Sequence, residues 1–351
     1  MVTPVDVNYF ADSGEDVWGG RSDDRSVLSL AASTMTPGDF VTIDSSSLNT
    51  KVDNLYPNDG RANDEFTDWA VSGSYDPSND RIYISGAPAN TLSDEGASTT
   101  ILQLDIKTNT WVAIRNPWGV ATGHCYDSTA FCDDILYKSG FGTPNLRYNV
   151  ETDTVLADIG RPPTTIGAGS ASWSTIDGSA FHPNMGVQGS LVWANSSLGR
   201  TCRYDIASDT WSLLHQAGNV LASAPVCHYS AFSDKVIFGV GRTTDPLYIV
   251  DAGESVTTTD NCPANLYAAA DGVLFAADPN SAKSILIMDN GEIHSLDHDT
   301  GQWTAEGMTP GEYPDNRNSK RWIAPTTKDG VFVIVDYSSN GNSIVYLYRY
   351  S

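Results

Sequence analysis

Positive charge is scarce in this sequence of 351 residues, which holds 20 Lys and Arg against 43 Asp and Glu and has a formal net charge of −23. A surface of this sign repels nucleic-acid phosphates and anionic membranes, because the Coulomb interaction that dominates nonspecific binding is unfavourable. We therefore expect no nucleic-acid partner, and a polyanionic substrate only where a local basic cluster reverses the field. Solubility or life in high salt also explains the acidity.

Cysteines, long apolar runs and targeting signals are scarce as well. The five cysteines include no C-x-x-C pair, and an odd count leaves at least one thiol free in a monomer, which argues against a secreted disulfide framework. No stretch approaches the roughly 18–20 apolar residues of a membrane span. Residues 1–30 carry acidic residues in place of the basic start and apolar stretch of a signal peptide. We expect no membrane insertion and no visible export signal.

Several motifs of catalysis and cofactor binding are missing. The chain has no P-loop, no G-x-G-x-x-G after a strand and no G-x-S-x-G. His124 and Cys125 are adjacent, so in a strand they point to opposite faces and cannot both bind one zinc ion, and the same holds for Cys227 and His228. A zinc site built from both histidines and an acid stays open. The Asp-rich turns lack the ligand spacing of a calcium loop, so the sequence predicts no cofactor and no metal.

The chain does contain a repeat. Three segments, Leu104–Trp111, Tyr204–Trp211 and Leu296–Trp303, each place an aspartate six residues before a tryptophan, and Tyr148–Val155 keeps the spacing with Asn and Val in those two places. Successive copies lie 44, 56 and 92 residues apart, and Asp251 marks the middle of the longest interval. A repeat of roughly 40–50 residues has the length of a propeller blade.

Each unit reads as strand, turn, strand, loop, strand, Asp-containing turn and strand, which is a four-stranded antiparallel meander. The last unit is one strand short, and Asp39–Ile43 can supply the missing outer strand, which closes the ring and hides its edges. The sequence therefore predicts an all-β fold, a β-propeller of about six four-stranded blades at 38–351, preceded by an N-terminal arm or flap at 1–37. The blades are expected near residues 64–115, 121–158, 168–214, 227–258, 272–306, and 321–351 plus 38–44.

The Tyr-Asp-x-x-Thr-x-x-Trp rhythm resembles that of kelch and galactose-oxidase-type propellers over roughly residues 38–351. The regular paired glycines of kelch repeats are missing, since Gly86 and Gly239 are isolated. The resemblance implies the fold and leaves the function open, because this fold supports enzymes, lectins and scaffolds alike. The acidic, compact chain also loosely resembles propeller proteins of marine tailed-phage virions.

The centre of the ring is the expected binding site. In a propeller the innermost strands line a central channel, so polar and aromatic residues at the starts of those strands converge at one mouth. The residues expected at this ligand-binding mouth are Trp69, His124, Trp173, His228 and Trp322. The alternative is that these aromatic residues plug the channel and pack between blades.

Two classes of function fit this architecture. The first is a non-enzymatic structural or adhesion module, such as a tail- or capsid-associated virion protein or an extracellular protein that binds partner subunits or surface polysaccharide. The second is a carbohydrate-active propeller, either a glycan-binding lectin or a polysaccharide lyase. The mouth is similar to that of propeller lyases, with a histidine as general base, a tyrosine as proton donor and an arginine to neutralise charge. Those residues would be His124, Tyr126, His228, Tyr229 and Arg321.

The segment before the repeat contains large apolar side chains among acids and small residues. A tryptophan is costly to expose to water, which favours docking of this segment onto the propeller or onto a partner. The residues expected to dock are Tyr9, Phe10 and Trp18.

Overall fold

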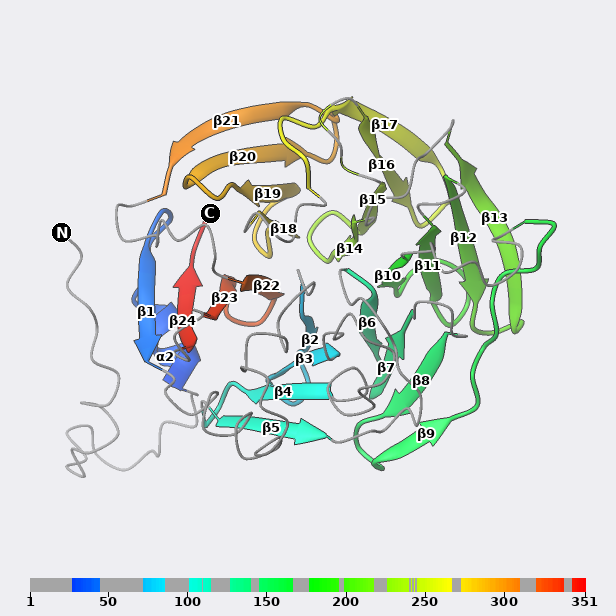
Figure 1. The fold of residues 1–351 in the computed structure, drawn as a ribbon, viewed down its shortest axis with the longest axis horizontal. Coiled ribbons are helices and arrows are strands. Elements are labelled where there is room, and N and C mark those ends of the chain that lie inside the picture. Colours follow the sequence, from blue (N-terminus) through cyan, green and yellow to red (C-terminus); the bar gives the residue numbers. More distant parts are fainter. Residues whose placement is uncertain are drawn as a thin grey trace, which may run out of the picture.

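The computed structural model describes residues 27–44, 72–85, 101–108, 110–114, 127–139, 145–166, 177–195, 199–217, 226–239, 241, 243, 245–266, 273–309, 320–337 and 343–351. Within them, 24 strands form six four-stranded antiparallel sheets arranged as blades around a ring (Figure 1). This arrangement confirms the predicted all-β propeller.

The strands follow one another around the ring in chain order, except that β1 joins the last blade. The first blade contains β2 (Ser74–Asp76), β3 (Arg81–Ser85), β4 (Ile101–Asp105) and β5 (Thr110–Ile114). The second contains β6 (Thr129–Cys132), β7 (Ile135–Lys138), β8 (Leu146–Asn149) and β9 (Thr154–Leu156). The third contains β10 (Asp177–His182), β11 (Ser190–Asn195), β12 (Arg200–Asp205) and β13 (Thr210–Gln216). The fourth contains β14 (Val226–Ser230), β15 (Lys235–Gly239), β16 (Pro246–Asp251) and β17 (Val256–Asn261). The fifth contains β18 (Leu274–Ala277), β19 (Lys283–Ile287), β20 (Glu292–Asp297) and β21 (Trp303–Met308). The last contains β22 (Lys320–Thr326), β23 (Val331–Tyr337), β24 (Ser343–Tyr348) and β1 (Phe40–Asp44).

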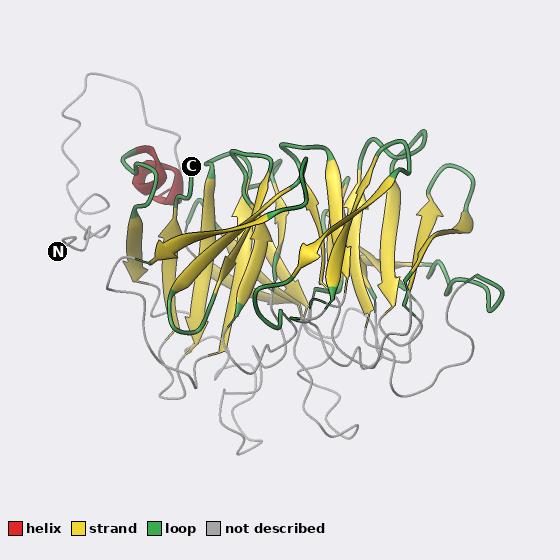
Figure 2. Ribbon diagram, turned by 90° about the horizontal axis from the view of Figure 1, so that it is seen from above, coloured by secondary structure: helices red, strands yellow, loops and turns green. Residues whose placement is uncertain are grey.

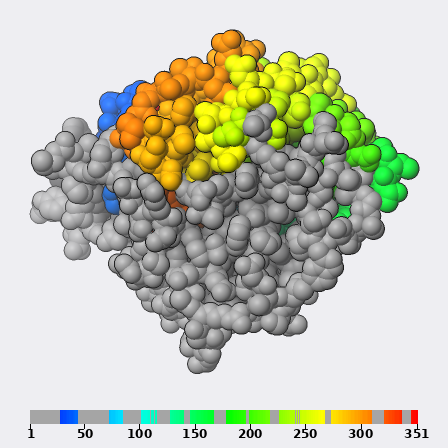
Figure 3. Space-filling view, turned by 45° about the horizontal axis from the view of Figure 1, so that its top comes forward, coloured from blue at the N-terminus to red at the C-terminus, as the bar shows by residue number. Residues whose placement is uncertain are grey.

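The blades radiate from the centre of the ring. The first strands of the blades, β2, β6, β10, β14, β18 and β22, lie innermost, and the fourth strands lie at the rim (Figure 1). Seen from the side, the strands cross the thickness of the ring (Figure 2). In the space-filling view, residues of the third to fifth blades, green through orange, lie together along one side of the molecule (Figure 3).

The two ends of the chain close the ring as predicted. Strand β1 pairs antiparallel with β24, with Phe40 opposite Tyr348 and Asp44 opposite Ile344. The pairing gives β24 a partner on both sides, so the last blade has four strands like the other blades. Asn280 of the fifth blade adds a tie, since its side-chain amide donates to the carbonyl oxygens of Gly330 and Ser351 at 2.7 Å each.

One short helix, α2 (Val27–Ser33), precedes β1 and packs against the joint between the last and first blades. Its buried side chains include Leu28, Ala31 and Ala32. The Ser29 hydroxyl donates to Asp329 at 2.5 Å, a contact between residues 300 positions apart. No helix in the described part of the chain is long and apolar enough to cross a membrane.

The repeated aspartate is a turn residue. The Asp105 carboxylate accepts hydrogen bonds from the amide and hydroxyl of Thr108, at 3.0 and 3.1 Å. Asn149, Asp205 and Asp297 accept the equivalent pair of bonds from the residue three positions on. Each side chain thereby satisfies donors of the tight turn between the third and fourth strands, which gives the repeat a structural explanation.

Tryptophans fill the space between blades. The Trp111 ring, at the end of the repeat motif, meets Trp322 of β22 edge-to-face with ring centroids 5.9 Å apart. Both side chains are fully buried in the joint between the first and last blades. In the second blade Val155 takes the tryptophan position and is 49% exposed, because its short side chain does not reach the neighbouring blade.

Candidate functional site

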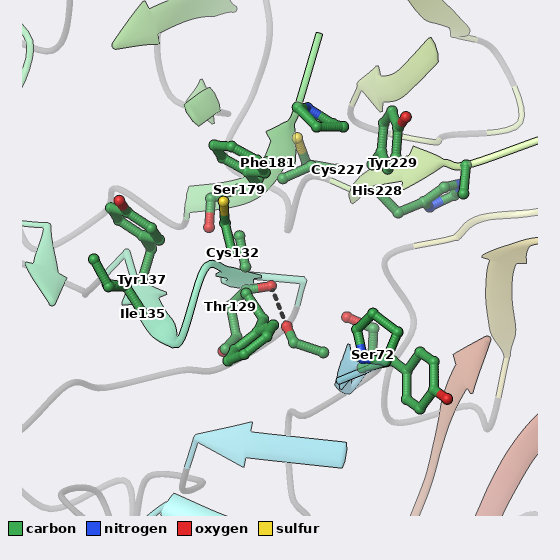
Figure 4. Close-up of a pocket in the computed structure, with 18 of the residues that line it drawn as sticks. Ser72, Thr129, Cys132, Ile135, Tyr137, Ser179, Phe181, Cys227, His228 and Tyr229 are labelled. Atoms are coloured by element: carbon green, nitrogen blue, oxygen red, sulfur yellow. Dashed lines mark hydrogen bonds between the residues drawn. The ribbon is translucent and has the colours of Figure 1, made fainter. Parts of the chain in front are cut away.

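A cavity of about 700 Å³ occupies the centre of the ring. Every blade contributes to its wall through its innermost strand or the turn that follows. Figure 4 shows side chains of β6 and β7, such as Thr129, Cys132 and Tyr137, on one side and those of β14, Cys227 and His228, on another. Most of the wall is apolar, with a small number of polar groups among the apolar ones. This composition is that of a small-molecule site.

The described rim of the cavity lies where the innermost strands end. It is formed by turns between first and second strands, including Pro77, Asp133, Pro183 and Gln188, all of which are exposed. Val187 on the same rim is 90% exposed. The mouth was expected at the opposite end, at the strand starts, and most residues expected there lie outside the described residues.

Asp127 holds the innermost strands together at the other end of the cavity. Its carboxylate accepts a hydrogen bond from the Ser72 hydroxyl and another, at 2.7 Å, from the Cys227 amide. Its backbone carbonyl accepts from the Ser179 amide at 2.8 Å. These bonds connect four blades at one residue, and its side chain is 5% exposed and lines the cavity. The sequence pattern did not point to Asp127, although it directly follows the expected His124 and Tyr126.

A chain of buried polar groups leads away from Asp127. His228 Nδ1 lies 3.8 Å from Asp127 Oδ2, and His228 Nε2 lies 2.9 Å from the Ser284 hydroxyl. That hydroxyl also bonds His298 Nε2 at 2.8 Å, and His298 Nδ1 bonds the Ser233 hydroxyl at 2.8 Å. Burial, together with the nearby His228 and Lys235, lowers the pKa of His298 to about 3. His298 is therefore neutral at physiological pH.

Asp127, His228 and Ser284 have the composition of a hydrolase triad without its geometry. Ser284 is completely buried, so its hydroxyl cannot attack a substrate in the cavity. The 3.8 Å separation between His228 Nδ1 and Asp127 is also too long for an orienting hydrogen bond. The three groups serve as a polar tie between the second, fourth and fifth blades.

Two of the residues expected at the mouth line the cavity. His228 does so with its ring 4.8 Å from that of Phe275, and its side chain is 11% exposed. Tyr229 also lines it, but its hydroxyl donates to Asp234 at 2.8 Å. Burial and this bond raise the pKa of Tyr229 above the ordinary tyrosine value.

Two other expected residues lie away from the cavity. The Arg321 guanidinium donates to Asp336 at 2.9 Å, and the two side chains are 1% and 6% exposed. Adjacent residues of a strand face opposite sides of the sheet. Trp322 lies on the side of its sheet that faces the first blade, so it packs between the two blades. The remaining expected residues, Trp69, His124, Tyr126, Trp173, Tyr9, Phe10 and Trp18, lie outside the described residues.

The two described cysteines of the cavity wall, Cys132 and Cys227, have raised thiol pKa values. Burial raises the pKa of both Cys132 and Cys227, with Asp133 and Asp127 adding to the respective shifts. A thiol held protonated is a poor nucleophile and a poor metal ligand. Across the described ranges no cluster of three or more His, Cys, Asp or Glu side chains is arranged to hold a metal.

The sequence matches no family model and no curated protein. Its fold does match solved structures, among them an auxiliary nutrient-binding protein from Bacteroides thetaiotaomicron. That structure is 15% identical, with a TM-score of 0.51 over 80% of this chain and 69% of the other. The likeness supports the propeller fold, and it does not extend to a particular kinship with kelch proteins or phage virion proteins. The chain is thus a six-bladed β-propeller with a cavity at its axis.

Proposed function

We propose that this protein is a non-enzymatic binding protein that holds a small solute, or the end of a glycan, in its central cavity. The observation that carries the proposal is the cavity, whose volume of about 700 Å³ lies within the roughly 300–1,000 Å³ of small-molecule sites. The structural neighbour from Bacteroides is a nutrient-binding protein, which also supports a binding function for this fold.

The chemistry of the wall favours binding over catalysis. A uronate lyase needs a cation to neutralise the substrate carboxylate, but no lysine or arginine is among the described residues of the wall. Arg321, the residue expected in that role, is committed to Asp336 inside the last blade. The hydroxyl of Tyr229, the residue expected as proton donor, donates a hydrogen bond to Asp234.

We further propose that the protein is part of a virus particle or mediates adhesion by binding partner subunits. It rests on the resemblance in sequence and on the apolar residues Tyr9, Phe10 and Trp18, which lie outside the described residues. Removing residues 1–26 tests it, because the truncated ring should then fail to join its assembly while keeping its ligand. Unchanged incorporation into particles would contradict the docking role.

The binding proposal is tested with a solute panel of neutral sugars, amino sugars, uronates, amino acids and amines, measured by isothermal titration. Gln188→Trp places a large ring on the rim of the cavity and should weaken binding of any solute that enters there. Gln302→Trp puts the same ring on an exposed turn of the fifth blade and should leave binding unchanged. Absence of binding across the panel, or equal binding by both variants, would overturn the proposal. Formation of unsaturated product from a uronate polymer would show a lyase instead.

A further inference from the structure

We propose that the central cavity selects a ligand carrying a positively charged amine, with Asp127 as its counter-charge. This inference rests on the proposed binding function and specifies the ligand class. The charged groups of the wall point to it: the described lining residues include the acids Asp127, Asp133 and Asp134, one histidine, and no lysine or arginine. An anion would enter a site whose fixed charges repel it, whereas an ammonium group would be attracted.

Asp127 is the acid best placed to act as counter-charge. Its carboxylate is 5% exposed, and its two hydrogen-bond donors, the Ser72 hydroxyl and the Cys227 amide, are neutral. A carboxylate has about four acceptor positions, so two bonds leave capacity for a ligand. The buried ammonium of Lys138 bonds the Ser128 hydroxyl and does not line the cavity. A low-exposure carboxylate is stabilised strongly by a cation that shares its surroundings.

Within the part of the chain that the structure describes, two further polar atoms of lining residues have no hydrogen-bond partner. They are the hydroxyl of Ser179, a residue only 1% exposed, and Nδ1 of His228. When His228 Nε2 carries the ring proton and donates it to Ser284, Nδ1 presents a lone pair beside Asp127. A hydroxyl also accepts, so Ser179 and His228 each add an acceptor atom to the carboxylate of Asp127. An ammonium group has three donors and no acceptor, which matches this set.

The rest of the wall suits the carbon skeleton of such a ligand. Phe131, Phe181, Phe275 and Tyr137 contribute apolar and aromatic surface, and aromatic rings tolerate a nearby cation better than an anion. The acids Asp133 and Asp134 lie on the rim, where they add attraction for an approaching cation. A net charge of −23 on the whole chain acts in the same direction.

A series of three probes of one shape and three charges tests the inference: benzylammonium, benzyl alcohol and benzoate. We expect benzylammonium to bind at least about tenfold more tightly than benzyl alcohol, and benzoate to bind weakest. The preference should shrink as salt is added, because ions screen the attraction at the rim.

Asp127→Asn removes the charge and can keep both contacts, because the amide oxygen can accept from the Cys227 amide and the amide nitrogen can donate to the Ser72 hydroxyl oxygen. It should therefore remove most of the benzylammonium preference. Asp260→Asn makes the same change on an exposed outer strand and should leave the preference intact. If Asp127→Asn does not fold, the double change Asp133→Asn and Asp134→Asn at the rim should reduce the preference in a folded ring.

The outcomes separate this inference from the function on which it rests. Equal binding of the three probes, tighter binding of benzoate, or no binding of benzylammonium by a protein that binds other panel solutes would overturn the amine inference alone. If no panel solute binds, the proposed function fails and the amine inference fails with it. A preference that survives Asp127→Asn in a folded protein would refute the assignment of Asp127.

Discussion

Aspartates hold left-handed backbone conformations at the tight turns of this propeller. Asp133 and Asp134 form the two-residue turn between β6 and β7, with φ of 46° and 63°. Two consecutive positive φ angles define a turn that favours Asn-Gly or Asp-Gly, because a Cβ atom is strained there. Asp134 stands at the position where such a turn usually has glycine. It therefore places a second carboxylate on the cavity rim at some cost in stability.

Asp134→Gly should raise the free energy of unfolding by about 0.5–1 kcal/mol, since the relief of strain exceeds the added freedom of the unfolded chain. Urea unfolding measures the change. Asp260→Gly, in the outer strand β17, is the control and should destabilise the protein instead, because its backbone does not have a positive φ angle. If Asp134→Gly lowers the free energy of unfolding, the Asp134 carboxylate stabilises the fold by more than the backbone strain destabilises it.

A tyrosine closes several turns by bonding an aspartate five residues later. Tyr75 bonds Asp80 at 2.9 Å and Tyr229 bonds Asp234 at 2.8 Å, and both aspartates have positive φ. The same device occurs at Tyr148 and Tyr204. The hydroxyl of Tyr229 thus has a structural role.

Tyr229→Phe should lower the free energy of unfolding by about 0.5–1 kcal/mol, through loss of one hydrogen bond to a carboxylate. Tyr248→Phe in the same blade is the control, because the Tyr248 hydroxyl makes no hydrogen bond with the described residues, and it should cost less. Equal stability of the two variants in chemical unfolding would contradict the turn-closing role.

At this scale the sequence predicted part of the site. His228 was expected at the centre because it stands at a strand start, and it does line the cavity. Asp127 was not expected, because its role comes from bonds to Ser72 and Cys227, far away in sequence. Trp322 alternates with residues on the opposite face of its strand, and a strand start alone does not tell which face meets the next blade.

Among the elements, the closing strand β1 was predicted and the helix α2 was not. The alternation in residues 39–43 and the incomplete last unit both indicated a strand that returns to the C-terminus, as the pairing with β24 shows. The helix spans only seven residues and has no acidic residue in its first turn, so it offers little periodicity. Its stability comes from packing on the blade joint.

Strand β1 should carry a substantial part of the stability of the ring. Ile43→Ala should lower the free energy of unfolding by about 2–4 kcal/mol, because Ile43 is 1% exposed and packs in the core shared by the last and first blades. Val155→Ala in β9, also an outer strand, should cost less than about 0.5 kcal/mol since Val155 is 49% exposed. Similar losses in the two variants would show that closure by β1 is energetically minor.

For the whole molecule, buried histidines make stability depend on pH. The pKa of His298 is lowered from 6.5 to about 3, mainly by burial, and burial also lowers the pKa of His182 and His215. Below pH 6.5 these histidines are protonated in the unfolded chain but stay neutral in the folded protein. The unfolded state then binds more protons, so acidification favours unfolding. Asp278 acts in the opposite direction, because burial raises its pKa.

Urea unfolding at pH 8 and at pH 5 should therefore show a larger loss of stability in the wild type than in His298→Gln, whose side chain cannot titrate. A pH dependence unchanged by His298→Gln would refute the assignment of this histidine as a buried neutral group.

Hydrogen–deuterium exchange with and without a bound panel solute tests most directly whether the axis of the propeller is its binding site. If the solute binds in the central cavity, we expect slower exchange in peptides from the inner strands and rim turns around 127–134, 179–189 and 226–231. Exchange in outer strands such as β13 and β21 should stay unchanged. Protection confined to the outer strands, with the inner strands unaffected by a solute that binds, would contradict it.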